Sequence, residues 1–384
     1  MTGIRARHVL VPFGTRPEVV KLAPVVRALR AAGHTVTVVD TGQHADPAMG
    51  SGVQASLGLH PTHRFELPAG QPARTGAVHA DAAAAVARFA PDLVLALGDT
   101  ATVPAYALAA RAAGVPFAHV EAGLRSFNGR SVEEVNRRVA AAVAQLHFAP
   151  TTRAAQFLAA EGVPAERVFV VGNPVVDTLV ERGTTPRPVA DRAGVLVTAH
   201  RPTNVDDPTR LARLVDVVRG LADEVGPVTF PVHPRTAARL ASTGLDRRLD
   251  HPGVRCTGPL DYDDLLAVLA GSVLAVTDSG GIQEEAAYLG VPVVVLRSST
   301  PRWEGVEAGT TTLAGLATDQ AAGDVLAAAR AHAAAEGQAR AAALPCPYGD
   351  GTAGAQVAAV LADPRTDQLL ALTEPDFTGG RLPW

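Results

Sequence analysis

The chain has 384 residues and a formal net charge of -4, with 47% hydrophobic and 19% charged residues. This composition is typical of a globular enzyme with substantial cores and excludes a disordered chain. The charge gives no global attraction for nucleic acid, no apolar run reaches membrane-spanning length, and the first residues lack a signal-peptide pattern. We therefore expect a cytoplasmic protein with neither nucleic acid nor a membrane as its partner. The two cysteines show no metal-ligand spacing.

Short runs of Val, Ile and Leu alternate with helical patterns along the chain. Such apolar strands between helices are typical of parallel sheets covered on both faces. Most runs end in polar residues or glycine, and ligands of open α/β sheets bind beyond the carboxyl ends of the strands. The pattern predicts an α/β fold of two doubly wound, Rossmann-like domains that face a cleft. The predicted strands are residues 8–14, 35–42, 92–99, 116–123, 167–173, 194–201, 228–233, 274–281 and 292–298.

The run of strands pauses at residues 174–193, which contain a Gly-Thr-Thr-Pro break. We place the junction there, between an N-terminal domain at 1–175 and a C-terminal nucleotide-binding domain at 190–350. An Ala-rich segment at 321–344 predicts one long helix. Residues 351–384 are expected to form a helix and tail that pack back on the first domain.

The stretch 13–29 reads FGTRPEVVKLAPVVRAL. A strand ends at Gly14, and Pro17 begins a helix because proline near the first helical position is a start signal. Arg16 and Lys21 then lie near the helix N-terminus, where both suit a phosphate group. The same spacing also fits an ordinary strand–helix turn with two solvated cations.

Carboxylates close two predicted strands, Asp99 in GDT and Glu121 in HVEAGLRS. Carboxylates at neighbouring strand ends in one crevice are candidates for acid–base work, because such a site can push their pKa values apart. For Asp99 taken alone, the sequence favours a cap of the following helix. Glu133 and Glu134 begin a further helix, where glutamates also simply complement the helix dipole.

Two histidines, His200 in TAHRPTN and His233 in PVHP, follow apolar strands of the second domain. Histidine is the side chain most easily poised near neutral pH. A zinc pair is rejected because the spacing fits neither HxH nor HExxH and no cysteine is near. The sequence therefore predicts no metal site.

Residues 277–296 read TDSGGIQEEAAYLGVPVVVL. Ser279, Gly280 and Gly281 lie between a strand and a helix, where glycines let backbone N–H groups approach an anion. Either Glu284 or Glu285, about one turn later, could accept the ribose hydroxyls of a nucleotide. The stretch matches neither GxGxxG nor GxxxxGK[ST], which argues against a dehydrogenase or an NTPase. Taken alone, it also fits a glycine-rich turn.

Together the motifs resemble the non-hydrolysing UDP-N-acetylglucosamine 2-epimerases, which are enzymes of the two-domain GT-B type. The matches run in order from residue 8 to about residue 362. They are GTRPE-x-x-K-x-AP, TGQH, GDT, HVEAGLRS, EE-x-NRR, VGNP-x-x-D, AHR, HP, TDSGGIQEEA-x-x-LG-x-PV-x-x-LR, EGVEAGT and PYGDG.

The resemblance implies an epimerase that converts UDP-N-acetylglucosamine to UDP-N-acetylmannosamine. UDP is eliminated to give a 2-acetamidoglucal and is then re-added. No NAD or metal is required, and a homodimer is expected. Asp99, Glu121, Glu133 and His200 match the family's catalytic positions. The matches to its nucleotide-binding positions are Arg16, Lys21, Ser279, Gly280, Gly281, Glu285 and Arg302.

Some bacterial members are activated by a second UDP-N-acetylglucosamine bound beside the first. Besides Glu133, the matching positions are Gln43, His44, Arg201 and His233. The chain departs from the family in the segment after TGQH and in HRPTN, where the family usually has HRREN. The proline that usually precedes the glutamate pair is replaced by Val132.

Two alternatives to the epimerase stay open at the level of sequence. A hydrolysing relative would release N-acetylmannosamine and UDP irreversibly. A catalytically silent regulator would only bind the sugar nucleotide, although it would not need the retained acid–base residues.

Overall fold

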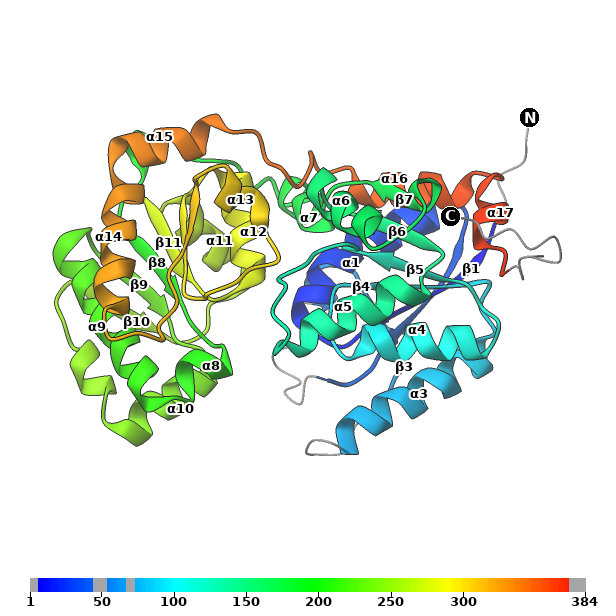
Figure 1. Ribbon diagram of the computed structural model, residues 1–384, viewed down its shortest axis with the longest axis horizontal. Coiled ribbons are helices and arrows are strands. Elements are labelled where there is room, and N and C mark those ends of the chain that lie inside the picture. The colour runs from blue at the N-terminus through cyan, green and yellow to red at the C-terminus, as the bar shows by residue number, and fades with distance from the viewer. Residues whose placement is uncertain (1–5, 44–53, 67–72, 373–384) are drawn as a thin grey trace.

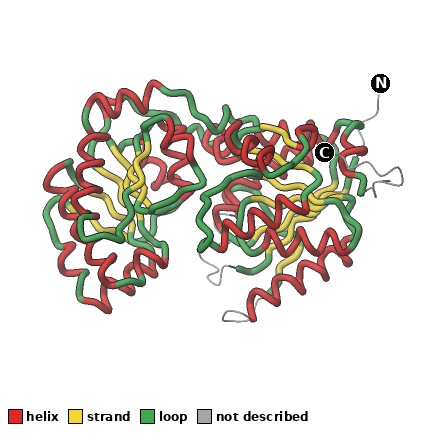
Figure 2. The backbone as a smooth tube through the Cα atoms, viewed as in Figure 1, coloured by secondary structure: helices red, strands yellow, loops and turns green. Residues whose placement is uncertain are grey.

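The computed structural model describes residues 6–43, 54–66 and 73–372, which form two lobes, each built on a parallel sheet (Figure 1). The first sheet has the order β3-β2-β1-β4-β5-β6-β7, and the second has the order β10-β9-β8-β11-β12-β13. Helices flank both sheets (Figure 2). The predicted fold class, two doubly wound α/β domains, is confirmed. The strands are β1 (His8–Phe13), β2 (Thr35–Asp40), β3 (His63–Arg64), β4 (Leu93–Leu97), β5 (Phe117–Val120), β6 (Leu146–Ala149), β7 (Val168–Val170), β8 (Val195–Thr198), β9 (Val228–Pro231), β10 (Val254–Thr257), β11 (Leu274–Thr277), β12 (Val293–Val295) and β13 (Thr311–Leu313).

The helices follow the strands, as the alternating sequence pattern predicts, with one difference. The Ala-rich segment at 321–344 forms two helices rather than one, because the backbone at Ala334 is extended, with ψ at 151°. The helices are α1 (Arg16–Ala31), α3 (Ala73–Phe89), α4 (Thr102–Ala112), α5 (Val132–Val143), α6 (Thr152–Ala160), α7 (Pro174–Glu181), α8 (Pro202–Val205), α9 (Pro208–Glu224), α10 (Pro234–Thr243), α11 (Tyr262–Ala270), α12 (Gly280–Leu289), α13 (Trp303–Glu307), α14 (Ala321–Ala333), α15 (Ala335–Ala343), α16 (Ala353–Ala362) and α17 (Thr366–Leu370). In the part of the chain that the structure describes, none of them is both long and apolar enough to cross a membrane.

The strand order of both sheets positions a ligand site. In the first sheet the order reverses between β1 and β4, and in the second it reverses between β8 and β11. Ligands of doubly wound sheets bind at such reversals, beyond the carboxyl ends of the strands. The loops after these four strands carry GTRPE, GDT, AHR and DSGG, so the topology gathers the motifs at the edges where the two sheets face each other.

The last described helices return to the first lobe, where the red α16 lies over it in Figure 1. Gly354 of α16 lies so close to α1 that a Cβ added to it would come 3.0 Å from the carbonyl oxygen of Pro24. Asp177 accepts hydrogen bonds from the backbone N–H groups of Ala353 and Gly354. Val357 and Leu361 join the buried core beneath α1. The exact domain boundaries stay a prediction.

Candidate active site

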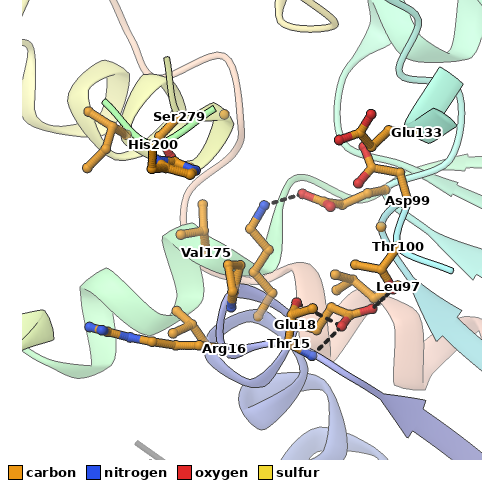
Figure 3. A pocket seen from close by; sticks show the side chains of 18 of the residues that line it. Thr15, Arg16, Glu18, Leu97, Asp99, Thr100, Glu133, Val175, His200 and Ser279 are labelled. Carbon is orange, nitrogen blue, oxygen red and sulfur yellow. Dashed lines mark hydrogen bonds and ion pairs between the residues drawn. The ribbon is translucent and has the colours of Figure 1, made fainter. Parts of the chain in front are cut away.

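A cavity of about 650 Å³ lies between the two lobes, and its size is typical of a small-molecule site. Both lobes line it. In Figure 3, Asp99 and Glu133 of the first lobe lie across the cavity from His200 and Ser279 of the second. Each predicted catalytic residue and each predicted nucleotide-binding residue lines this cavity. These residues are Arg16, Lys21, Asp99, Glu121, Glu133, His200, Ser279, Gly280, Gly281, Glu285 and Arg302.

Glu121 lies just beyond β5 and is 5% exposed. Its backbone is left-handed, with φ at 63°, an unusual conformation for a residue other than glycine and one that is enriched at functional sites. Its carboxylate accepts hydrogen bonds from Lys21 at 2.5 Å and from Asn173 at 2.6 Å. Burial raises the pKa of Glu121, but the charges of Lys21 and Arg302 outweigh burial and hold it below its usual range. The carboxylate is therefore ionised at neutral pH and can accept a proton.

Asp99 follows β4 and forms an ion pair with Arg137 of α5. Asn136 donates a hydrogen bond of 2.8 Å to the backbone carbonyl of Asp99. The next helix, α4, has Ala101 as its N-cap and no side-chain cap bond, so Asp99 does not cap it. The capping role that the sequence favoured for Asp99 taken alone is therefore wrong, and its catalytic role stays a prediction.

Glu133 lies in the first turn of α5 but reaches beyond it. One oxygen accepts a 2.6 Å hydrogen bond from the Ser131 hydroxyl, and the other pairs with Arg201 of the second lobe at 2.5 Å. Burial raises the pKa of Glu133, but Ser131 and Arg201 together lower it to about 2. Its neighbour Glu134 points elsewhere and accepts hydrogen bonds from the backbone and hydroxyl of Ser126. Glu133 and Glu134 therefore make specific side-chain contacts in addition to their favourable position at the helix N-terminus.

Glu18 lines the same cavity, and the sequence analysis did not propose it. Its carboxylate accepts hydrogen bonds from the backbone N–H groups of Gly14 and Thr15 and from the hydroxyl of Thr100. Burial raises the pKa of Glu18 to about 7 in spite of these bonds. Glu18 ties the loop after β1 to the loop that carries Asp99. The available signal was its position three residues after Thr15, which is typical of a helix-capping glutamate.

In the second lobe, the first turn of α12 faces the cavity through Ser279, Gly280 and Gly281. The first N–H groups of a helix have no partner within it, so they can bind an anion. A Cβ on Gly280 would lie 2.6 Å from a guanidinium nitrogen of Arg302, which explains the glycine there. Arg302 is held by Glu284 through bonds of 2.8 and 2.7 Å. Backbone N–H groups and a cation thus meet at one end of the cavity.

The two adjacent glutamates of α12 face different ways, which the sequence did not resolve. Glu285 lines the cavity and accepts a 2.9 Å hydrogen bond from the hydroxyl of Tyr262. Burial raises its pKa to about 7. Glu284 does not line the cavity; it contacts Lys21 and Arg302 instead. Of the two, Glu285 is therefore the candidate for the ribose hydroxyls.

His200 is anchored by Asp278, a fully buried residue that the sequence analysis did not single out. Asp278 accepts hydrogen bonds from the backbone N–H groups of His200 and Arg201 and from the side chain of Asn204. Nδ1 of His200 lies 3.3 Å from the Asp278 carboxylate. Burial lowers the pKa of His200 although Asp278 opposes this, so a neutral imidazole faces the cavity. The ring of His233 lies nearby, tilted by 35°, with 5.6 Å between the centroids.

The positions that match the effector site have other contacts in this structure. Gln43 donates a hydrogen bond to the hydroxyl of Thr102. His233 caps α10, since its Nδ1 accepts the backbone N–H of Arg235. Arg201 pairs with Glu133, and His44 lies outside the described residues.

The departures at HRPTN and at Val132 lie among the described residues, whereas residues 45–53 and 67–72 of the segment after TGQH lie outside them. Pro202 and Thr203 are exposed in α8, while Asn204 of the same motif is buried. Val132 lines the cavity and is 69% exposed. Within residues 6–43, 54–66 and 73–372, no group of three or more His, Cys, Asp or Glu side chains could hold a metal ion.

Comparison with known proteins places these observations in a family. The family model described as UDP-N-acetylglucosamine 2-epimerase matches residues 27–362. The UDP-N-acetylglucosamine 2-epimerase of Bacillus subtilis is 38% identical over 323 residues, which cover 80% of this chain and 83% of the relative. The UDP-2,3-diacetamido-2,3-dideoxy-D-glucuronate 2-epimerase of Pseudomonas aeruginosa is 35% identical over 320 residues, which cover 81% of this chain and 89% of the relative.

A solved structure agrees with these relatives. The UDP-GlcNAc 2-epimerase of Methanocaldococcus jannaschii, in complex with UDP-GlcNAc and UDP, matches with a TM-score of 0.81 and 31% identity. The match covers 92% of this chain and 99% of that one. The resemblance predicted from the motifs is confirmed, and the chain belongs to the UDP-N-acetylglucosamine 2-epimerase family.

Proposed function

We propose that this protein inverts C2 of UDP-N-acetylglucosamine and so produces UDP-N-acetylmannosamine. The main support for the proposal is that the two lobes contribute different kinds of groups to the cavity. Three carboxylates from the first lobe, Asp99, Glu121 and Glu133, face a helix N-terminus and Arg302 in the second lobe. Acid–base groups on one side and an anion site on the other suit a reaction that moves a proton beside a leaving diphosphate.

The first half-reaction is an elimination. The bond between C1 and the diphosphate oxygen breaks, and the electron pair leaves with UDP. The charge that develops at C1 acidifies the hydrogen at C2. A carboxylate removes this proton, and the electrons of the C2–H bond form the C1=C2 double bond of 2-acetamidoglucal. Glu121 is the candidate that we favour for this base, because its side chain is 5% exposed, against 29% for Asp99 and 35% for Glu133.

The second half-reaction reverses the first on the other face of the ring. A proton is delivered to C2 from the opposite side, and the diphosphate oxygen of UDP adds back to C1. UDP must therefore stay bound between the two steps. The turn at Ser279–Gly281 and Arg302 would hold the diphosphate, Glu285 would accept the ribose hydroxyls, and His200 would lie near the phosphates. Two proton transfers and one retained leaving group leave no net oxidation.

The charges of the cavity favour a neutral sugar over a uronate such as that in the name of the Pseudomonas aeruginosa relative. Of the Arg and Lys side chains that line the cavity, Lys21, Arg201 and Arg302 are paired with carboxylates. A sugar that carries its own carboxylate would add negative charge that these cations are poorly placed to balance.

The test is to incubate the protein with UDP-N-acetylglucosamine in heavy water and follow the anomeric proton by NMR. We expect a mixture of both epimers at equilibrium, with deuterium at C2 of the product. Product without solvent label would exclude the mechanism. Complete conversion to free N-acetylmannosamine and UDP would support the hydrolysing alternative instead. The homodimer stays a prediction that light scattering after gel filtration can check.

A further inference from the structure

Glu284 is a fully buried carboxylate at the boundary between the two lobes. It lies in the first turns of α12 in the second lobe. One of its oxygens accepts a 2.6 Å hydrogen bond from Lys21 of the first lobe. The other accepts 2.8 and 2.7 Å contacts from Arg302, just before α13. A buried carboxylate with this many charged partners has a fixed position and a fixed charge.

Glu284 completes a row of alternating charges, here called the charge row, formed by Glu121, Lys21, Glu284 and Arg302. Lys21 lies in the middle, 2.5 Å from Glu121 and 2.6 Å from Glu284. Burial lowers the pKa of Lys21, but the two carboxylates outweigh burial and raise it. The row therefore alternates two acidic and two basic side chains. Glu284 also raises the pKa values of four other nearby groups, Glu285, Tyr262, Tyr348 and Cys346.

We propose that Glu284 is a positioning residue that holds Lys21 against Glu121 and Arg302 beside the diphosphate site, and that its charge limits how tightly the site binds UDP. This inference rests on the proposed function, because that reaction needs UDP both to leave C1 and to add back to it. Without Glu284, two buried cations would face the diphosphate with only Glu121 to balance them. Such a site would bind UDP too tightly for UDP to add back to C1.

Replacement of Glu284 by glutamine should strengthen UDP binding while it slows turnover, a combination that ordinary structural damage does not produce. Removal of a buried negative charge beside an anion site strengthens anion binding. We expect Glu284→Gln to bind UDP about tenfold more tightly than the natural protein and to lose on the order of 100-fold in kcat. Simple loosening of the site would weaken UDP binding and slow turnover together.

Two further variants separate charge from position. Glu284→Asp keeps the charge but withdraws it by one methylene, so we expect UDP affinity within about twofold of the natural protein and kcat about tenfold lower. The matched control is Glu304→Gln. Glu304 is also a carboxylate of the second lobe that joins the lobes, since it accepts hydrogen bonds from Thr151 and Tyr348, but it does not contact Lys21 or Arg302. We expect its affinity for UDP to be unchanged.

The experiment is calorimetric titration of the full-length protein and the three variants with UDP, together with kcat from the epimerisation assay and circular dichroism to check folding. Unchanged or weaker UDP binding by Glu284→Gln would overturn the proposal, and so would the same signature in Glu304→Gln. If Glu284→Gln does not fold, Glu284→Asp decides, and the natural kcat in that variant would overturn it. UDP affinity needs no turnover, so failure of the natural protein to epimerise would reject the proposed function separately.

Discussion

The two lobes present opposite kinds of chemistry to the same cavity. The first lobe contributes three carboxylates that are each paired with a cation: Glu121 with Lys21, Asp99 with Arg137, and Glu133 with Arg201. A fourth, Glu18, is held by backbone N–H groups and a hydroxyl. The second lobe contributes backbone N–H groups at the start of α12 and the guanidinium of Arg302. The two sheets share the same strand order except for the additional edge strand β7 of the first, so the fold alone does not separate the roles. What separates them is which residues follow the strands at each reversal of order.

The strongest test of this difference is to neutralise Glu121, a buried carboxylate of the first lobe. We expect Glu121→Gln to lower kcat by about 1000-fold, because general acid–base groups contribute about 100- to 10,000-fold to such reactions. UDP affinity should not fall, because loss of this charge leaves Lys21 and Arg302 less balanced beside the proposed diphosphate site. NMR of product and of deuterium at C2 measures the loss. Glu336→Gln on the exposed surface is the control and should be fully active.

The second test uses acid, which should loosen the first lobe before the second. His119 donates a hydrogen bond to the carbonyl of Gly98, and burial lowers its pKa to about 4. Burial lowers the pKa of His147 on the adjacent strand to about 3. In the unfolded chain both titrate near 6.5, so the unfolded state binds more protons as the pH falls.

Above pH 6.5, His119 imposes no penalty on the free energy of unfolding. As the pH falls toward 4, this free energy decreases by about 3 kcal/mol, at about 1.36 kcal/mol per pKa unit. Hydrogen exchange resolved along the chain at pH 7 and pH 4.5 measures this loss for each lobe. Equal protection of β5 and β6 at the two pH values would contradict the expectation.

The third test compares two neighbouring glycines of the second lobe. A Cβ at Gly280 would displace the buried Arg302, whereas a Cβ at Gly281 would meet only the Ser279 hydroxyl, at 4.0 Å. We expect Gly280→Ala to weaken UDP binding about tenfold and to lower the melting temperature of the free protein. Gly281→Ala should melt within a degree or two of the natural protein. Calorimetry and thermal denaturation check both variants, and equal melting temperatures would count against the assigned position of Arg302.

The smallest expected effect concerns the ribose. Tyr262→Phe removes the hydroxyl that donates to Glu285. We expect the affinity for UDP to fall about threefold, because a hydrogen bond to a charged group contributes only about 1.5–3 kcal/mol and part of it is regained from water. The affinity for 2′-deoxy-UDP should fall less. If Tyr262→Phe weakened both nucleotides equally, Glu285 would not be the group that contacts the ribose.

The comparison of the lobes also shows what sequence reasoning can reach. Polar residues after apolar strands indicated the positions of Asp99, Glu121, His200 and Ser279, because parallel strands bring their carboxyl ends to one edge. The orientation of Glu284 and Glu285 was out of reach. Adjacent helical residues point about 100° apart, and only the packing of α12 against the first lobe decides which one faces the cavity.

Contacts between residues far apart in the sequence also could not be predicted. Lys21 was expected to contact phosphate, but in this structure it bridges Glu121 and Glu284, and no local spacing reports a contact between residues 263 positions apart. Four strands, β3, β6, β10 and β13, were not predicted, and each contains at most one Val, Ile or Leu. The roles of the two lobes were predicted from the sequence, whereas the contacts of Lys21 with Glu121 and Glu284 needed the structure.

The most direct test of this assignment is a crystal structure of the protein with UDP bound. We expect the diphosphate against the N-terminus of α12 with Arg302 beside it, and the ribose within hydrogen-bonding distance of Glu285. A uridine diphosphate bound instead among Asp99, Glu121 and Glu133 would contradict the division of labour between the lobes.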